Sequence, residues 1–262
     1  PHETPASFEA LNAYSWQNSC VMVGCHIDAH GDAANQWTHS AHQQSANPFY
    51  MRVLDEPGGQ EAHAALCSRC HEPLRKLADP QNQAQLRDAR SQGVSCGVCH
   101  FMKRDPTQPT QNGVYGFSVH ERYLAKIRMP STKPMIVYDN KAEHHGETLP
   151  PGLRAPESCG VCHELTLNNV HLRSTYSEWV EGRHGKVGDE AYKNCVDCHM
   201  PSTATYYSSA YPDRTTHDHR LLGSNLMITG GQPGLRKLKI AFMASALALS
   251  FEPGRDAKGR IT

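Results

Sequence analysis

The sequence has little of what an ordinary protein core is built from. Of its 262 residues, only 38% are hydrophobic and 7% are aromatic. A chain of this length normally buries a large apolar core, because the fraction of surface buried on folding rises with chain length. The composition therefore predicts that protein side chains alone do not fill the interior.

Net charge and long apolar runs are also missing. Lys plus Arg and Asp plus Glu number 26 each, so the charge balance predicts neither a nucleic-acid partner nor a basic membrane-docking face. The longest apolar stretch, residues 240–249, is about half of the ~20 residues that span a bilayer. We therefore expect no transmembrane segment. The chain begins at Pro1 rather than Met, as an exported chain does once its signal peptide is removed, and equally as a chain cut elsewhere would.

Cysteine and histidine are in surplus, and they occur together. The ten Cys form five pairs, and a His follows the second Cys of every pair. With 17 His in the chain, the odds that this happens by chance are on the order of one in a million. Four pairs have the spacing C-x-x-C-H and the first has C-x4-C-H. The five motifs are Cys20/Cys25/His26, Cys67/Cys70/His71, Cys96/Cys99/His100, Cys159/Cys162/His163 and Cys195/Cys198/His199.

The C-x-x-C-H spacing is typical of covalent haem attachment. The two thiols form thioethers with the vinyl groups on one edge of a haem, and the adjacent His binds the iron. Five apolar haem discs would also supply the core that the composition lacks. We therefore predict five covalently bound haem c groups, attached through all ten cysteines, with the proximal iron ligands His26, His71, His100, His163 and His199.

Two other interpretations of the motifs stay open. Disulfides are common in exported proteins, but they leave the five histidines unexplained. Zinc ribbons use C-x-x-C pairs in twos, and five pairs with five histidines give an awkward ligand count for tetrahedral sites. The two extra residues between Cys20 and Cys25 can loop out between the thioethers, and for that pair the alternative is a structural disulfide.

A weak internal repeat surrounds two further histidines. Trp37 lies five residues before His42, and Trp179 lies five residues before His184. Each of these segments follows one haem motif and precedes another. The repeat predicts two related modules.

The modules belong to one predicted pentahaem cytochrome domain, residues 1–234. They cover about residues 14–105 and 155–224, and a proline-rich connection at residues 105–156 joins them. Residues 235–262 are predicted to form a separate C-terminal tail. Alternating apolar residues near the end of that tail indicate a small β-hairpin or the start of a β-domain.

The fold class follows from these patterns. We predict short α-helices and irregular loops wrapped around covalent haems, as in a multihaem cytochrome c. We expect little β-structure except in the C-terminal tail. Helix-compatible composition marks four stretches, namely residues 62–70, 83–92, 119–127 and 175–181.

The second axial ligand of each iron is expected to be histidine. Twelve His remain after the proximal ones are assigned, and eight Met are the rival ligands. This supply favours bis-histidine coordination. Two candidates follow the repeated Trp, whose indole can pack on a haem, one lies past the last motif, and the rest lie in the proline-rich connection. In that order the candidate distal ligands are His42, His184, His219, His145, His144 and His120, with one of the adjacent pair expected to bind.

Several strings resemble multihaem c-type cytochromes of the superfamily that includes the nitrification tetrahaem cytochrome, hydroxylamine oxidoreductase and octahaem reductases. The resemblance covers about residues 14–224, and the C-x4-C-H motif departs from the usual pattern. It implies an exported protein that passes electrons along stacked or perpendicular haem pairs. The strings that carry it are Gly93-Val-Ser-Cys96-Gly-Val-Cys99-His100, Thr175-Tyr-Ser-Glu-Trp179, Cys195-Val-Asp-Cys198-His199-Met-Pro201 and Trp37-x-x-Ser40-x-His42.

Three functions are compatible with such a chain. An electron-transfer haem is best sealed by two strong ligands, whereas a haem enzyme needs an open sixth position. The chain has enough spare histidines to fill the sixth position of every iron. We therefore predict a soluble electron carrier or relay between redox partner proteins rather than an enzyme. Thioether attachment takes place outside the cytoplasmic membrane, so we expect a periplasmic or extracellular location.

The alternatives are a polymeric extracellular wire and a haem enzyme. If His2 or another terminal histidine ligated a haem of the next copy, the head-to-tail contact would propagate as a filament. An enzyme of nitrogen or sulfur oxyanion chemistry would need one open haem. The pentahaem nitrite reductases carry a C-x-x-C-Lys motif, which this sequence lacks, whereas hydroxylamine oxidoreductase uses a C-x-x-C-His haem with a tyrosine cross-link.

The motif count gives a first prediction. The intact mass of the denatured holoprotein should exceed the chain mass by five haem groups, because thioethers survive unfolding. Replacing both Cys20 and Cys25 with Ser should remove one haem. A mass excess of four haems in the unsubstituted protein would instead identify the C-x4-C-H pair as a disulfide.

Overall fold

A computed structural model of the chain describes residues 3–5, 7–13, 33–54, 56–120, 155–206, 215–223 and 233–246. The first motif, Cys20/Cys25/His26, and the candidates His144 and His145 lie outside these residues. The chain divides into two compact units, Pro1–Leu221 and Leu222–Thr262. The boundary therefore precedes the one predicted after residue 234.

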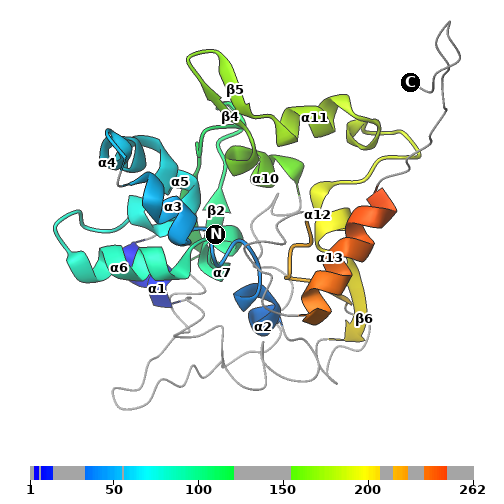
Figure 1. Cartoon of the computed structure of the whole chain (residues 1–262), viewed down its shortest axis with the longest axis horizontal. Coiled ribbons are helices and arrows are strands. Elements are labelled where there is room, and N and C mark those ends of the chain that lie inside the picture. Colours follow the sequence, from blue (N-terminus) through cyan, green and yellow to red (C-terminus); the bar gives the residue numbers. More distant parts are fainter. Residues whose placement is uncertain are drawn as a thin grey trace, which may run out of the picture. The chain divides into compact units, whose positions relative to one another are not determined.

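Short helices dominate the first part of unit 1 (Figure 1). Two predicted helices are found here, since residues 62–70 are helical and residues 83–92 are the helix α6. The elements in chain order are β1 (Glu3–Pro5), α1 (Phe8–Ala13), α2 (Ala33–Thr38), α3 (Pro48–Val53), α4 (Gly59–Ala62), the π-helical turn η2 (His63–Cys67), α5 (Ser68–His71), the 3-10 turn η3 (Pro73–Lys76), α6 (Gln83–Gln92) and α7 (Cys96–Phe101).

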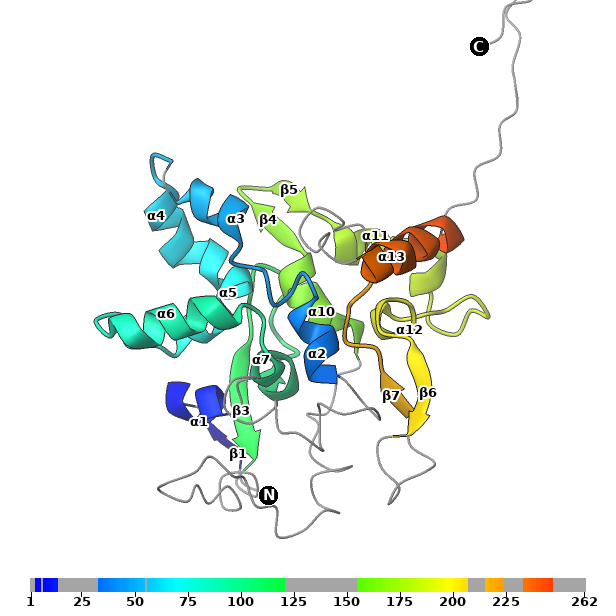
Figure 2. The same cartoon turned by 60° about the horizontal axis from the view of Figure 1, so that its bottom comes forward.

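The second part of unit 1 mixes helical turns with small hairpins. The predicted helix at residues 175–181 is found as α11. The helical elements are α10 (Pro156–His163), α11 (Thr175–Glu181), the 3-10 turn η4 (Arg183–Gly185) and α12 (Cys195–His199). In both Figure 1 and Figure 2, α1 and α6 lie to the left of α10 and α12.

The described strands form three small antiparallel sheets, all before residue 235. One has the order β1-β3-β2, and the others are the hairpins β4-β5 and β6-β7. The strands not yet named are β2 (Met102–Lys103), β3 (Gly116–His120), β4 (Leu165–Leu167), β5 (Val170–Arg173), β6 (Ser202–Tyr206) and β7 (Thr215–His217). The sequence predicted little β-structure in this region, because strands this short have no clear alternation.

The predicted helix at residues 119–127 is wrong where the structure describes it. Val119 and His120 end the strand β3, and their backbones pair with Thr4 and Glu3 of β1. A pairing partner so distant in the sequence leaves no local signal.

Side-chain caps define where two of the helices begin. The side chain of Asn82 accepts hydrogen bonds from two backbone N–H groups of the first turn of α6. Asn194 and Asp197 form a reciprocal capping box at the start of α12. Such caps satisfy N–H groups that have no partner inside the helix. They fix the first residue of α12, which is Cys195 of the last motif.

A small apolar core lies among α1, η3, α6 and α7. It consists of the buried residues Phe8, Leu11, Leu74, Ala89, Val98 and Phe101. Val98 lies between the two cysteines of the third motif, so one haem-attachment helix packs directly on this core.

Unit 2 contains the helix α13 (Pro233–Ala246). Residues 235–246 of the predicted C-terminal tail are therefore helical. The alternating residues Leu247, Leu249 and Phe251 lie outside the described residues. Among the helices that the structure describes, none is long and apolar enough to cross a membrane.

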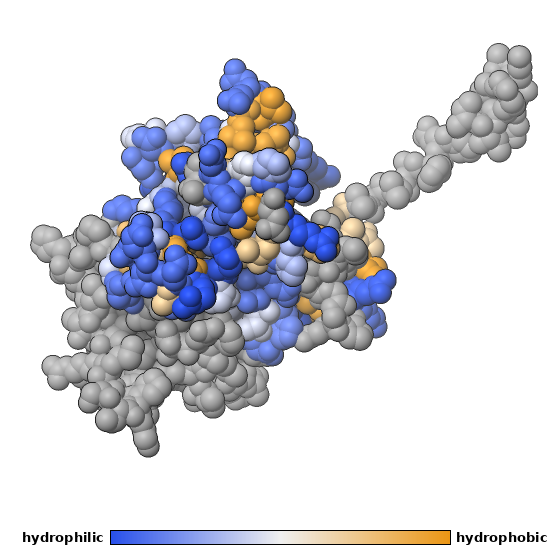
Figure 3. All heavy atoms as spheres, turned by 60° about the vertical axis from the view of Figure 1, so that its left-hand side comes forward, coloured by the Kyte–Doolittle hydropathy of each residue, from blue (hydrophilic) through white to orange (hydrophobic). Residues whose placement is uncertain are grey.

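Apolar side chains are exposed on the β4-β5 hairpin. Figure 3 is turned about the vertical axis from Figure 1, so each element keeps its height, and an apolar area appears near the top, where Figure 1 places this hairpin. Val170 and Leu172 of β5 are 57% and 58% exposed, and Leu167 of β4 is 37% exposed. The hairpin thus contributes little apolar burial to unit 1.

The contrast between the core and the hairpin gives a second prediction. Leu74→Ala, at a fully buried position, should lower the free energy of unfolding by about 2–5 kcal/mol, because it leaves a cavity. The same change at exposed Leu172 should alter it by less than about 0.5 kcal/mol. Denaturant unfolding followed by circular dichroism measures both, and equal losses would contradict the position of the core.

Candidate functional site

Each described haem motif occupies a helical turn. The motifs lie on α5 with the preceding Cys67, on α7, at the end of α10 and on α12. Side chains at positions i, i+3 and i+4 of a helix share one face. Both thiols and the imidazole of each motif therefore face the same side, as attachment to one edge of a haem requires. The residues present fit this cofactor.

The structure brings cysteines of different motifs together. Cys162 hydrogen-bonds to Cys70, and this contact lowers the pKa of the Cys70 thiol while raising that of Cys162. Cys159 hydrogen-bonds to Cys195 in the same way, which lowers the pKa of Cys195 and raises that of Cys159. Three haem motifs thus meet at their cysteines, with the motif on α10 between the other two.

The described cysteines carry no cross-links in this structure. All eight are free thiols. Among the described residues, no group of three or more His, Cys, Asp or Glu side chains could hold a metal ion by itself.

His42 and His163 form an opposed pair. Their ring centroids are 5.9 Å apart and the rings are inclined by 77°. A metal ion bound at ~2.0–2.1 Å to one nitrogen of each ring would place the centroids roughly 6 Å apart. The centroid separation of His42 and His163 is therefore compatible with two imidazoles on one metal ion.

Burial keeps both of these imidazoles neutral. It lowers the pKa of His42 to about 4, with the charges of Arg173 and His199 acting in the same direction. It lowers the pKa of His163 to about 3, helped by the charges of His42 and Arg173. A neutral imidazole has a free nitrogen lone pair at neutral pH, and only that form can bind iron.

The repeated Trp segments are joined to the haem motifs by the same hydrogen bonds in both modules. Trp37 Nε1 donates to the Val94 carbonyl at 2.8 Å, and Val94 N donates to the His42 carbonyl at 2.9 Å. Val94 lies two residues before Cys96. We call this arrangement, from the Trp to the His with its two bonds, the Trp strap.

The second Trp strap has the same geometry. Trp179 Nε1 donates to the Lys193 carbonyl at 2.9 Å, and Lys193 N donates to the His184 carbonyl at 3.0 Å. Lys193 lies two residues before Cys195. The internal repeat seen in the sequence is therefore a structural repeat. The first strap fixes His42 relative to the motif that begins at Cys96, and the second fixes His184 relative to the motif that begins at Cys195.

Gly93 permits the close approach of the first strap. Its φ is +53°, and a Cβ there would lie 2.4 Å from the Gln43 carbonyl oxygen and 2.6 Å from that of His42. A side chain would force the strap away from α7. Glycine is thus required by space as well as by backbone conformation.

Several other histidines have their ring orientation fixed by a backbone carbonyl. When Nδ1 donates to such a carbonyl, Nε2 is left with the lone pair that a metal needs. The donors and acceptors are His39 to Asn35, His71 to Ser45, His184 to Ala191, His217 to Met200 and His219 to His217, at 2.6–2.7 Å. This pattern includes the predicted residues His71, His184 and His219.

His39 and His217 share this orientation although the sequence gave no reason to single them out. His217 lies at the end of β7, and its Nδ1 is 2.7 Å from the Met200 carbonyl just after the last motif. Residue spacing alone does not reveal which ring nitrogen a fold leaves free. Of the other predicted ligands, His120 has a described backbone only, His100 is half-buried and His199 is exposed.

His63 has a buried carboxylate partner. Its Nε2 lies 2.9 Å from Glu72 Oε1, so this nitrogen is engaged by Glu72. Glu72 is fully buried and also lies 3.2 Å from Arg90 Nε and 3.5 Å from Arg75 Nη1. Burial lowers the pKa of His63, while Glu72 acts in the opposite direction.

Tyr115 lies at the centre of the motif cluster, and the sequence did not single it out. Burial raises its pKa, and the thiols Cys162, Cys70 and Cys99 act in the same direction. Its hydroxyl donates to the Arg69 carbonyl. Tyr115 is therefore buried near cysteines of three motifs, and its hydroxyl is held by the segment that carries Cys70.

The buried partners of Glu72 give a third prediction. Glu72→Ala should lower the free energy of unfolding by about 3–5 kcal/mol, because it leaves His63 and two guanidinium groups without their buried carboxylate. Glu178→Ala is the matched control at an exposed position and should cost less than about 1 kcal/mol. Equal destabilisation would show that the Glu72 cluster contributes no special stability.

Comparison with known proteins adds no relative. No protein-family model, no curated protein and no solved structure matches the chain. The interpretation of the site therefore depends on the five cysteine-histidine motifs, the opposed pair His42 and His163, and the two Trp straps.

Proposed function

We propose that the protein transfers electrons through five covalently bound c-type haems, as a carrier or relay between redox partner proteins. The opposed pair His42 and His163 is the observation that carries this proposal. Two neutral imidazoles with centroids 5.9 Å apart would supply iron with two strong axial ligands, and a centre sealed in this way favours electron transfer over substrate binding. A bound haem c supplies a one-electron iron couple.

The residues of each motif have different roles in binding the cofactor. The two cysteines attach it covalently, and the following histidine is its proximal ligand. Four motifs meet these needs with helical turns in the described structure. The fifth, Cys20/Cys25/His26, is assigned the same role from the sequence.

The cysteine contacts support close spacing of the attachment points. Cys70 contacts Cys162, and Cys159 contacts Cys195. The motif on α10 is therefore the neighbour of both the motif on α5 and the motif on α12. Electron transfer needs neighbouring cofactors, because its rate falls steeply with the distance between their edges.

The Trp straps support the assignment of the distal ligands. Each strap ties a histidine backbone to the residue two positions before a haem motif. His42 and His184 occupy equivalent positions in the two straps, so we assign both as distal ligands. His219 joins them, because burial lowers its pKa and its Nδ1 is 2.7 Å from the His217 carbonyl.

The proposal includes a location outside the cytoplasmic membrane, since thioether attachment is completed there. The periplasm and the extracellular surface both meet this condition. Detection of the haem-loaded protein in a periplasmic or extracellular fraction tests this part of the proposal.

Removal of a distal ligand gives the fourth prediction. His42→Ala should convert one haem from low-spin to high-spin and make it bind carbon monoxide, because one axial position opens. The number of haems found by mass should not change, because the thioethers remain. Low-temperature electron paramagnetic resonance during a redox titration reports the spin states and axial ligands.

His171→Ala is the control, since the His171 side chain is 63% exposed and has no assigned role as a ligand. It should leave every haem low-spin. If His42→Ala also leaves every haem low-spin, the Trp strap is structural and His42 is not a ligand. A large high-spin signal in the unsubstituted protein would favour an enzyme, and a uniform monomer in size-exclusion chromatography would exclude a wire.

A further inference from the structure

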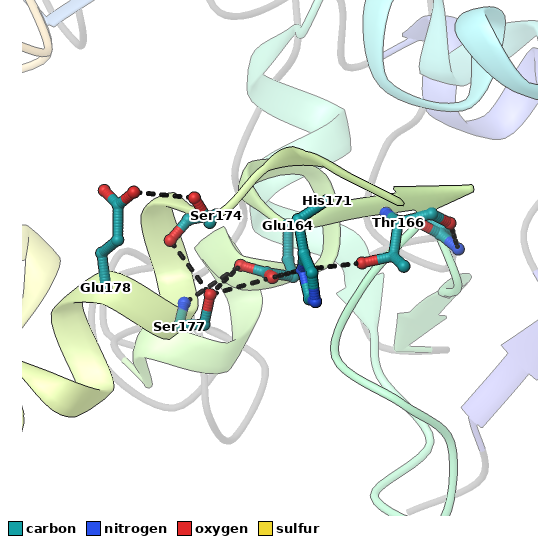
Figure 4. Close-up of polar contacts among 7 residues, drawn as sticks. Glu164, Thr166, His171, Ser174, Ser177 and Glu178 are labelled. Carbon is teal, nitrogen blue, oxygen red and sulfur yellow. Dashed lines mark hydrogen bonds and ion pairs between the residues drawn. The ribbon is translucent and has the colours of Figure 1, made fainter. Parts of the chain in front are cut away.

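A buried carboxylate directly follows the histidine of the motif on α10. Glu164 is 5% exposed. Its Oε2 accepts a hydrogen bond from Ser177 N at 3.0 Å, and its Oε1 accepts one from Ser177 Oγ at 3.0 Å. Figure 4 shows this carboxylate between Ser177 of α11 and His171 of β5, whose Nδ1 is 3.6 Å from Glu164 Oε1.

The charge of Glu164 is less compensated than that of the other buried carboxylate beside a motif. Glu72 has two guanidinium groups and His63 within ion-pair distance. Among the described residues, Glu164 has neither an Arg nor a Lys partner within that distance. Its polar contacts come from a serine and from a histidine side chain that is 63% exposed to water. Among the described residues, no Arg or Lys therefore pairs with the buried carboxylate of Glu164, the residue after His163.

We infer that Glu164 lowers the reduction potential of the haem held by Cys159, Cys162 and His163, and this inference rests on the proposed function. Reduction adds one negative charge at the iron. A buried carboxylate nearby opposes that charge, and water screens the repulsion only weakly at a buried site. Burial and surrounding charge are among the means by which a protein sets haem potentials.

Arg173 provides a charge of opposite sign near the same motif. In the β4-β5 pairing it lies opposite Leu165, the residue after Glu164. Its charge acts on both His42 and His163. Arg173 is exposed, so water screens it more than it screens Glu164. The two residues should therefore move the potential in opposite directions.

Three charge-changing variants of the holoprotein test the inference. Glu164→Gln should raise the midpoint potential of one haem, and Arg173→Gln should lower that of the same haem. Glu178→Gln is the matched control, because Glu178 is exposed on α11, and it should leave the titration unchanged. Spectroelectrochemical titration with low-temperature electron paramagnetic resonance resolves the shifts, and intact mass confirms the haem count of each variant.

Opposite shifts in the Glu164 and Arg173 variants would support the inference, because a merely structural disturbance has no reason to follow the sign of the charge. An unchanged or lowered potential in Glu164→Gln would overturn it, as would an equal shift in Glu178→Gln. A protein that carries no haem would overturn the proposed function, and the inference with it. A haem-loaded protein with unshifted potentials would overturn the inference alone.

Discussion

The opposition of His42 and His163 is the contact on which the interpretation of the structure depends. It joins the two modules, because His42 belongs to the first Trp strap and His163 to the motif on α10. Burial of both rings is costly for a charged imidazole, so each ring stays neutral at ordinary pH. The two rings lie 5.9 Å apart and are inclined by 77°, a centroid separation that is compatible with two ligands of one metal ion.

The Trp straps explain how a chain with so little apolar content holds its histidines in position. An indole N–H and one backbone N–H fix each strap to the residues before a motif. Hydrogen bonds of this kind position a segment without the large apolar contact area that a core would need. The two straps contain the same hydrogen bonds, so the modules share this local structure as well as the sequence pattern.

Buried carboxylates beside the motifs play different roles. Glu72 lies in a cluster with Arg75, Arg90 and His63, which ties η2, η3 and α6 to the motif on α5. Glu164 instead links the end of α10 to α11 through Ser177. Both residues stabilise the segment that follows a haem-binding histidine. Among the described residues, Glu164 has weaker cationic compensation than Glu72.

The sequence alone determined the features that depend on local spacing. The five motifs, the Trp repeat, and the helices at residues 83–92 and 175–181 follow from residues close together in the chain, because helical contacts join positions three and four apart. The haem count and the iron ligands remain predictions from that spacing.

Tertiary structure decided what depends on partners distant in the sequence. Residues 119–120 pair with β1 instead of beginning a helix, and residues 235–246 of the predicted tail form the helix α13. The opposition of His42 to His163, the free Nε2 of His217 and the burial of Glu164 also needed the fold. A local sequence pattern does not predict which distant segments come into contact, because those contacts depend on packing across the whole unit.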